Sequence, residues 1–381
     1  MAQKQAEAAE AIRGMTYGEY YRWLMGLRIN LSDYLTHPMN EAGWEAREFV
    51  PVDEMLLRKL EEAGETQRAG TVGRILRHAA GLSLGEVARL RWAQGYGKQK
   101  KEERIRAYLE KFRPDVIFIR EPCHLDGRFF DSVRNRCLLV GMIACPTNHP
   151  WHWDAHRHDL IFTFTEEYRR FFEVQGIPSR ILQLGVDERV ARETGNLPKV
   201  YDCTFVGYLG QPHQQAKTEL MAKVAQTGKL RWWGPKGEEI SRHPALEASW
   251  QGMTGGLEML KIYGQSKIVL NDYPDFMQGQ SNNMRNMEAL SVGSLLLTRH
   301  ADSIAGLERE GALATFRDAE ECAGKIHHFL QEDGERERIA RKGAEVARER
   351  FNYRTIVRGM MEAIGEAYEK KKPRMNEWDR C

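Results

Sequence analysis

The stretch Gln278–Arg299, QGQSNNMRNMEALSVGSLLLTR, decides the fold of the second half of this chain. Residues 278–283 are polar and include a glycine, which predicts a loop that ends in the N-cap of a helix. A short helix is predicted over Met284–Ser291, because its apolar residues recur every three positions. Residues 292–294 break this helix, and the apolar run 295–298 then predicts a short buried strand.

The predicted helix carries chemistry at its N-terminal end. Its first N–H groups and its partial positive charge suit a diphosphate, and the guanidinium of Arg285 can neutralise phosphate. Glu288 lies one turn further along, where its carboxylate can accept both hydroxyl groups of a ribose. The same spacing fits a surface ion pair between Arg285 and Glu288, and spacing alone favours this plainer interpretation.

The order of residue types in SNNMRNMEALSVGSLLLT resembles the donor-site segment of GT-B glycosyltransferases. It looks most like the spore-maturation-protein-B-like group, which is often described as glycosyltransferase family 1 or family 4-like. The similarity extends upstream through 257–271 and 201–207, and it covers most of residues 112–365. The resemblance implies two Rossmann-like α/β domains that face a central cleft, with a nucleotide-sugar donor bound by the second domain.

The resemblance also implies which residues bind the donor. These are Gly207, Lys217, Trp233, Gly234, Ser281, Asn282, Asn283, Met284, Arg285 and Glu288. Relatives more often carry Arg at the position of Lys217, and Trp233 fits a buried core equally well. Retaining enzymes of this fold often have a second Glu at the position of Gln280, so the retaining pair is incomplete and the stereochemistry stays open.

Length and charge limit the classes of protein to which the chain can belong. Its 381 residues predict two domains, and a hydrophobic share of 42% suffices for their cores. The formal net charge of +2 gives no global attraction to nucleic acid or to an anionic membrane. No apolar run approaches the ~20 residues of a membrane helix. Residues 1–14 lack the apolar centre of a signal peptide.

The cysteines are scattered and form no C-x-x-C pair. The chain has six of them: Cys123, Cys137, Cys145, Cys203, Cys322 and Cys381. This pattern predicts reduced thiols rather than a disulfide framework or a zinc site. We therefore expect a cytoplasmic protein.

Residues 1–111 are predicted to be mostly helical. Apolar periodicity favours helices within 17–35, 53–62, 71–79, 82–92 and 98–112. The only strand candidate is 47–52, although relatives usually open with a buried strand and a Gly-containing turn. The basic run 95–106 is interleaved with Glu102 and Glu103, which favours a solvated helix face over a nucleic-acid patch.

From Arg113 onward the pattern is that of a doubly wound α/β domain. Strands are predicted at 116–119, 137–144, 159–164 and 179–184, with helices at 128–136 and 166–175. Ligands of parallel sheets bind beyond the carboxyl ends of the strands. This rule places Glu121, His124, Asp126 and the loop 146–158 at the functional edge.

The loop 146–158 contains four histidines, His149, His152, His156 and His158. Histidine is the commonest metal ligand, but no matching cysteine or carboxylate pair accompanies these residues, and two tryptophans are interleaved with them. We therefore expect no metal site. A sugar-binding surface and a plain surface loop fit the loop equally well.

Residues 196–199 are predicted to link the two domains. The second domain is predicted to contain strands at 204–207, 230–233, 268–271, 295–298 and 314–316 and helices at 215–227, 257–266, 319–331 and 334–350. In GT-B folds a terminal helix, here from Phe351 to Lys370, crosses back to the first domain. The predicted domains are thus 1–196 and 200–350, followed by a crossover helix and tail over 351–381.

The resemblance implies transfer of a sugar from a nucleoside-diphosphate sugar to an unknown acceptor, which is a saccharide, a protein or a small molecule. His124, Asp126 and His213 are the catalytic candidates. The resemblance implies no cofactor and no tightly held metal, and the absence of a D-x-D pair near a strand end fits this expectation. Two alternatives stay open: a sugar-nucleotide epimerase or hydrolase of the same fold, and a non-catalytic protein that binds nucleotides or nucleic acid through Trp232, Trp233 and residues 98–106.

Overall fold

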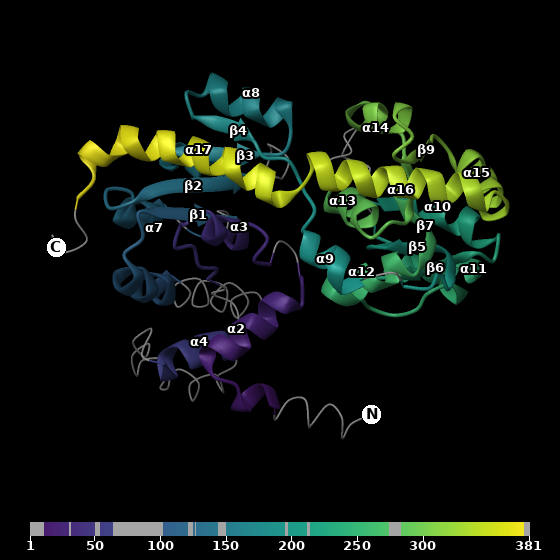
Figure 1. Ribbon diagram of the computed structural model, residues 1–381, viewed down its shortest axis with the longest axis horizontal. Helices are drawn as coiled ribbons and strands as arrows, with labels where there is room; N and C mark the ends of the chain where they lie inside the picture. The colour runs from purple at the N-terminus through teal and green to yellow at the C-terminus, as the bar shows by residue number, and fades with distance from the viewer. Residues whose placement is uncertain are drawn as a thin grey trace, which may run out of the picture. The chain divides into compact units, whose positions relative to one another are not determined.

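The computed structural model describes residues 11–29, 32–49, 54–63, 102–120, 125, 127–143, 150–194, 197–211, 214–273 and 283–376. The chain forms two compact units (Figure 1). Unit 1 comprises Met1–Gly26, Glu45–Leu182 and Gly359–Cys381, and unit 2 comprises Leu27–Trp44 and Gln183–Arg358. The segment Leu27–Trp44, which the sequence analysis placed with residues 1–196, therefore groups with unit 2.

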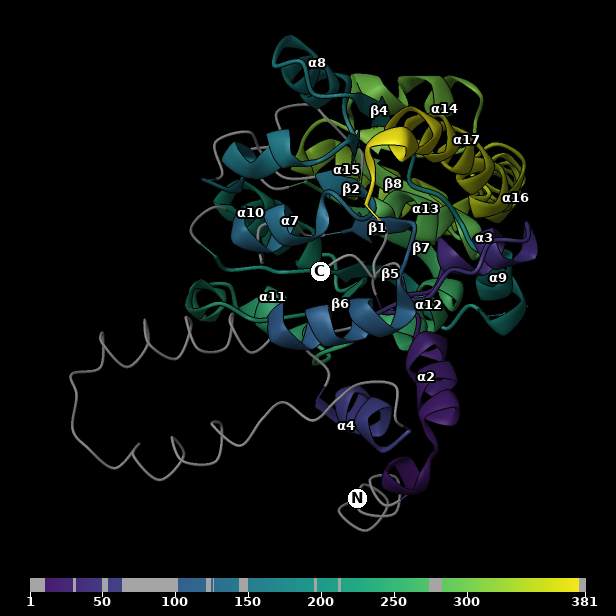
Figure 2. The ribbon, with the colours of Figure 1, turned by 90° about the vertical axis from the view of Figure 1, so that its left-hand side faces the viewer.

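Unit 1 contains a parallel sheet whose described strands follow the order β1-β2-β3-β4. The strands are β1 (Val116–Ile119), β2 (Leu138–Ile143), β3 (Leu160–Thr163) and β4 (Ser179–Ile181). Every residue of β2 is buried, as expected for a strand with both faces covered. Figures 1 and 2 show α8 (Glu166–Val174) beside β4.

The remaining helices of unit 1 precede or connect these strands. They are a helical turn over 11–14, α2 (Tyr17–Gly26), α4 (Glu54–Glu62), a helix over 102–112, α7 (Gly127–Val133) and the 3-10 helix η2 (Pro150–Arg157). The helix expected over 17–35 ends at Gly26, because the chain leaves for unit 2 at Leu27. The predicted strand at 47–52 is wrong for residues 47–49, which form no strand, and its other residues lie outside the described ranges, as do the helices expected at 71–79 and 82–92.

The α/β class and the parallel sheet predicted for unit 1 are confirmed. The described strands lie in the sheet in the order in which they occur along the chain. Alternating strands and helices predict the class of a sheet but leave its strand order open.

Helix α17 (Tyr353–Lys371) begins in unit 2, and its residues from Gly359 onward group with unit 1. There its last turns contact residues that precede the strands. The Tyr368 hydroxyl donates to the Asp115 carboxylate at 2.8 Å, and the Lys371 ammonium donates to the Cys137 carbonyl at 2.9 Å and pairs with Asp159. The end of α17, followed by η7 (Lys372–Arg374), is thus fastened at the amino ends of three neighbouring strands.

Unit 2 contains a parallel sheet in the order β6-β5-β7-β8-β9. Its strands are β5 (Tyr201–Val206), β6 (Leu230–Trp233), β7 (Ser266–Asn271), β8 (Leu295–Arg299) and β9 (Ala314–Phe316). Its described helices are α3 (Thr36–Glu41), α9 (Glu188–Thr194), α10 (Gln215–Ala225), η4 (Glu238–Arg242), α11 (Pro244–Ala248), α12 (Gly256–Gly264), α13 (Met284–Ser291), η6 (Asp302–Ile304), α14 (Ala305–Arg309), α15 (Ala319–Gln331) and α16 (Asp333–Arg350).

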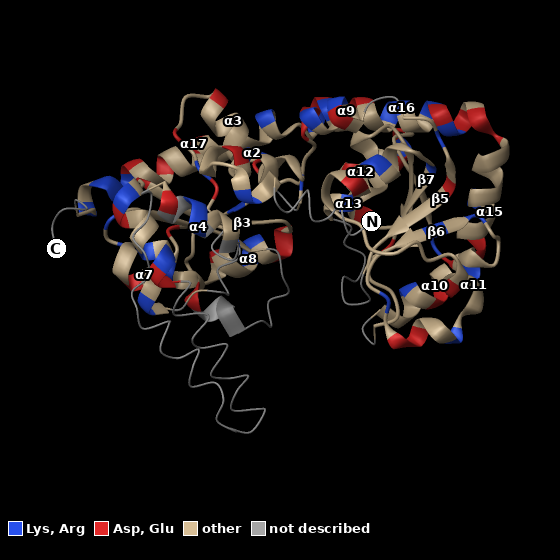
Figure 3. Ribbon diagram, turned by 90° about the horizontal axis from the view of Figure 1, so that it is seen from below, with Lys and Arg blue, Asp and Glu red and all other residues tan. Residues whose placement is uncertain are grey.

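The sheet of unit 2 is covered on both faces. Figure 3 shows β5, β6 and β7 between α12 and α13 on one side and α10 and α15 on the other, with charged residues concentrated on the helices. One apolar core fills the space between the sheet and the second pair of helices, around Phe205, Trp232 and Phe316. Cys137, Cys203 and Cys322 are buried free thiols. No described helix has the length and hydropathy needed to cross a membrane.

His158 is a buried titratable group in the core of unit 1. Its ring lies 4.9 Å from the Phe130 ring, and a Cβ on Gly141 would lie only 2.9 Å from the imidazole. Neither ring nitrogen has a hydrogen-bond partner in the described residues. Burial lowers the pKa of His158 to about 4, so the ring is neutral at pH 7.

Acid should therefore destabilise the protein through His158. Between pH 6.5 and 4 the unfolded chain binds a proton that the folded protein does not, so the free energy of unfolding falls as the pH falls, by roughly 2 kcal/mol between pH 7.5 and 5. His158→Phe should remove this part of the acid dependence, whereas His156→Phe, at an exposed position, should keep it. Urea titrations at both pH values measure the effect, and an unchanged pH dependence in His158→Phe would contradict it.

Candidate functional site

The strand order of unit 2 reverses between β5 and β7. β6 lies on one side of β5, and β7, β8 and β9 follow on the other side. Crossover connections therefore diverge at this point, and open α/β sheets bind ligands there, beyond the carboxyl ends of the strands. Gly207 follows β5 and Asn271 ends β7, so these two residues mark the candidate site.

Helix α13 begins beside this point and has the bounds expected from the sequence. Asn283 has an extended backbone conformation, and its Oδ1 accepts a hydrogen bond from the backbone N–H of Asn286 at 3.2 Å. Asn283 is thus the N-cap that the sequence predicts. Met287 and Leu290 are buried, while Arg285 and Glu288 lie half-buried on another face of the helix.

The side chain of Asn271 connects β7 to β8 and to the first turn of α13. It is fully buried, and its Nδ2 donates to Asn286 Oδ1 at 2.7 Å and to Thr298 Oγ1 at 3.3 Å. The amides of Asn271 and Asn283 also bond to each other at 3.3 Å. Asn271 Oδ1 accepts from Arg285 Nη1 at 3.4 Å. Buried amides need such partners, so this network fixes the N-terminus of α13 against the strand ends.

Lys217 and Arg285 converge on one aromatic ring. Lys217 Nζ and Arg285 Cζ each lie 5.9 Å from the centroid of Phe205. A Cβ on Gly207 would lie 3.6 Å from Arg285 Nη2, so the backbone at Gly207 passes close to this guanidinium. Arg285 Nε is buried and has no hydrogen-bond partner in the described residues. Two cations thus stand beside Gly207 at the switch point, where they can neutralise an anion.

Gly234 allows the loops after β5 and β6 to approach each other. Its φ is +139°, and a Cβ at this position would lie 2.2 Å from the carbonyl oxygen of Gly207. The Gly207 N–H donates to the Trp233 carbonyl at 2.9 Å. Only glycine fits this backbone geometry at position 234, whereas a Cβ on Gly207 would lie 2.9 Å from Cζ of the Phe205 ring.

Glu288 lies close to Arg285 and Tyr263. Burial raises the pKa of the Glu288 carboxyl, and the charge of Arg285 opposes this rise. Burial also raises the pKa of the Tyr263 phenol, whose hydroxyl has no hydrogen-bond partner in the described part of the chain. No ion pair joins Arg285 to Glu288 in these ranges, so the plain ion-pair interpretation of their spacing is wrong. The Glu288 carboxylate keeps its capacity to accept hydrogen bonds.

The other residues singled out from the sequence differ in their burial and surroundings. Trp233 is 7% exposed and meets the Tyr201 ring edge-on at 5.3 Å, which makes it a core residue. Met284 is half-buried.

Of the loop histidines, His156 is exposed while His158 is buried, so these two side chains do not converge. In the described ranges no group of three or more His, Cys, Asp or Glu could hold a metal. His124, Asp126, His213, Ser281 and Asn282 lie outside the described residues.

Three contributors to the site were missed by sequence reasoning, namely Phe205, Tyr263 and Asn271. The sequence could have identified Asn271, because a polar residue that ends an apolar strand marks a position where the strand meets a ligand or a polar network. It could not have identified Phe205 and Tyr263, since aromatic residues in a strand and a helix fit an ordinary core.

The fold is that of the GT-B glycosyltransferases. Solved structures with the same arrangement include sucrose-phosphate synthase from Thermosynechococcus elongatus, with a TM-score of 0.53, 13% identity, and coverage of 72% of this chain and 79% of that chain. Anabaena HepE in complex with UDP-glucose gives a TM-score of 0.50, 13% identity, and coverage of 70% and 82%. A glycosyltransferase from Rickettsia africae gives 0.51, 11% identity, and coverage of 78% and 88%.

A protein-family model also matches part of this chain. Residues 214–362 match the family described as glycosyl transferase-like. The matched range contains Lys217, Gly234, Asn271, Arg285 and Glu288, and thus most of the candidate site. No match to a curated protein is found for this sequence.

Removal of the Asn271 amide should destabilise unit 2. Asn271→Leu leaves buried amide and hydroxyl groups of its neighbours without a partner, which should lower the free energy of unfolding by roughly 2–3 kcal/mol. Gln251→Leu removes an exposed amide from the same unit and should cost less than about 0.5 kcal/mol. Denaturant titration of both variants measures the difference, and equal losses would contradict the role of the Asn271 network.

Proposed function

We propose that this protein is a glycosyltransferase that moves a sugar from a nucleoside-diphosphate sugar to an acceptor. The observation that carries the proposal is the convergence of Lys217 and Arg285 beside Gly207, with Glu288 one turn further along α13. The GT-B fold and the family match of residues 214–362 support it. HepE, which shares the fold, was solved with UDP-glucose, and this makes UDP the first nucleotide to test.

In the proposed complex the diphosphate lies between Gly207 and the N-terminus of α13. The first N–H groups of the helix and the partial positive charge at its end suit this anion. Arg285 and Lys217 add two full charges, and the buried Arg285 Nε supplies a donor that lacks a partner in the described residues. Glu288 accepts hydrogen bonds from the ribose hydroxyls. Ser281, Asn282, Asn283 and Met284 belong to the donor site in this proposal, whereas Trp233 contributes to its supporting core.

The proposed reaction joins an acceptor oxygen to the anomeric carbon of the sugar. The bond from that carbon to the diphosphate breaks, the diphosphate leaves with the electron pair, and the acceptor proton passes to a base. His124, Asp126 and His213 are the proposed acid–base residues. The contribution of unit 2 is electrostatic, because Lys217, Arg285 and the α13 N-terminus stabilise the charge that develops on the leaving diphosphate.

We propose further that no metal and no cofactor take part. The two cations beside Gly207 supply the charge that a divalent ion supplies in metal-dependent transferases. We also propose that the protein belongs to the spore-maturation-protein-B-like group. Its acceptor is a saccharide, a protein or a small molecule.

Two substitutions should separate the roles of Arg285 and Glu288. Arg285→Ala should weaken UDP more than uridine, because only UDP carries the charge that Arg285 neutralises. Glu288→Ala should weaken both, by roughly 1–3 kcal/mol each, because both contain the ribose. Calorimetry gives these affinities for the wild type and both variants.

The matched control for these substitutions is Arg231→Ala, which removes an exposed arginine from β6 and should leave both affinities unchanged. Equal weakening of UDP and uridine by Arg285→Ala would show that Arg285 does not bind phosphate. Unchanged binding in Glu288→Ala would remove the ribose assignment. A wild-type protein that binds no nucleoside diphosphate at all would contradict the proposed function itself.

Sugar transfer should survive removal of divalent metal. The rate of UDP release from UDP-glucose should change by less than about twofold after treatment with EDTA, because Lys217 and Arg285 stabilise the charge on the leaving diphosphate. Loss of the rate with EDTA, followed by its return on addition of one metal, would overturn the metal-independent mechanism.

A further inference from the structure

The segment Leu27–Trp44, here called the N-terminal strap, is built into unit 2 although it lies near the start of the chain. The carbonyl oxygen of Leu27 accepts the backbone N–H of Leu257 at 2.7 Å, in the first turn of α12. Gly256 has a φ of +55°, and a Cβ there would lie 2.1 Å from the Leu27 carbonyl oxygen. The start of α12 is therefore shaped to receive the strap.

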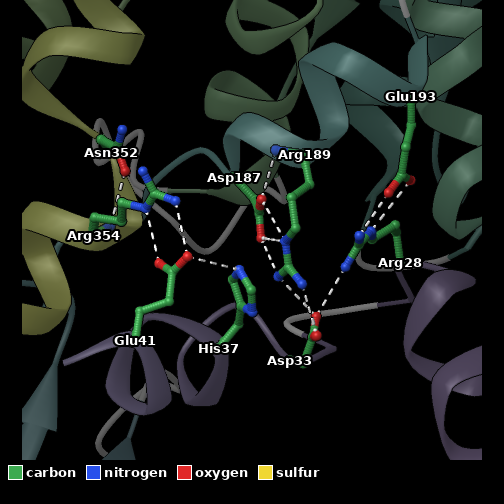
Figure 4. Close-up of polar contacts among 9 residues, drawn as sticks. All are labelled: Arg28, Asp33, His37, Glu41, Asp187, Arg189, Glu193, Asn352 and Arg354. Atoms are coloured by element: carbon green, nitrogen blue, oxygen red, sulfur yellow. Dashed lines mark hydrogen bonds and ion pairs between the residues drawn. The ribbon is translucent and has the colours of Figure 1, made fainter. Parts of the chain in front are cut away.

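Ion pairs join the strap to helix α9 (Figure 4). The guanidinium of Arg28 lies between two carboxylates, at 2.9 Å from Asp33 and 2.6 Å from Glu193. Arg189 binds Asp33 with both terminal nitrogens, at 2.8 and 2.9 Å, and also pairs with Asp187. The Arg28 side chain is 6% exposed and that of Asp33 19% exposed. These are charge-assisted bonds that water screens little.

The strap also contacts the start of α17. The Tyr34 ring stacks on the Tyr353 ring at 5.5 Å, and Arg354 binds the Glu41 carboxylate with two bonds of 2.9 Å. Figure 4 shows Arg354 reaching Glu41 from beside Asn352. The chain passes between unit 1 and unit 2 at both ends of the strap, shortly before α9 and within α17. The contacts of the strap therefore join the segments of unit 2 that lie next to these crossing points.

Helix α9 leads from this cluster to the candidate site. It packs against both α12 and α13, and α13 carries Arg285 and Glu288. Tyr34, the strap residue that stacks on Tyr353, is 5% exposed. The strap therefore reaches α13 through α9.

We propose that the N-terminal strap is a positioning element of the donor half, in which its ion cluster with α9 holds α13 in place and thereby orients the Glu288 carboxylate. The role of Glu288 toward the ribose rests on the proposed function, whereas the coupling of the strap to α13 does not. Asp33 is a positioning residue in this proposal, because it does not need to touch the donor. The site of unit 2 is then incomplete without residues 27–44.

Hydrogen–deuterium exchange of the full-length protein without nucleotide tests the coupling. Asp33→Asn removes the acceptor shared by Arg28 and Arg189, and it should speed amide exchange about 5-fold or more in peptides from 32–44 and also in those from 284–291. Exchange in α15, in the same unit, should not change. Glu310→Gln breaks the ion pair of Glu310 with Arg350 and should leave α13 unaffected. Unchanged exchange in α13 of Asp33→Asn would overturn the proposal.

UDP binding provides a second test. Asp33→Asn should weaken UDP binding about 5-fold, and it should have no further effect once Glu288 is replaced by Ala, because the strap acts through the position of that carboxylate. Glu310→Gln should bind UDP as the wild type does. Additive effects of Asp33→Asn and Glu288→Ala would overturn the orientation of Glu288 by the strap. A wild type that binds no UDP contradicts the proposed function instead, and the exchange experiment still decides on the strap.

Discussion

The buried amide of Asn271 is the interaction on which the candidate site depends. It stands at the carboxyl end of β7, at the switch point of the sheet, and it bonds to Asn283, Asn286, Thr298 and Arg285. An amide in this environment tolerates few arrangements, because each of its donors and acceptors needs a partner. The N-cap of α13, the first turn of that helix and the guanidinium of Arg285 therefore take their positions from one side chain.

The charges of the site follow from this arrangement. Arg285 is held over Phe205 beside Gly207, and Lys217 approaches the same ring from α10. The core of unit 2 lies beneath this ring, so both cations are drawn partly out of water. A diphosphate that arrives at the α13 N-terminus then meets a field arranged before binding, in surroundings where charges interact more strongly than in bulk water. The strap adds support to α13 through α9.

The sequence predicted the parts of this site that depend on local patterns. The bounds of α13 and its cap at Asn283 follow from capping and periodicity. Gly207 and Gly234 were assigned to the site from the family resemblance. The place of Leu27–Trp44 in unit 2 was not predictable, because ion pairs such as Arg28–Glu193 join residues far apart in the chain and leave no periodic signal. The partners of Asn271 were hidden for the same reason. Spacing alone suggested an Arg285–Glu288 ion pair, whereas in the structure the Arg285 guanidinium bonds to Asn271.

The proposed binding of a nucleoside diphosphate by unit 2, at the N-terminus of α13, is tested most directly by a crystal structure of the wild-type protein with UDP. The diphosphate should lie beside Gly207, within hydrogen-bond distance of Arg285 and of the first N–H groups of α13, and the ribose hydroxyls should bind Glu288. Electron density for UDP elsewhere in the protein, with Arg285 still bonded to Asn271 and Glu288 without a ligand, would contradict it.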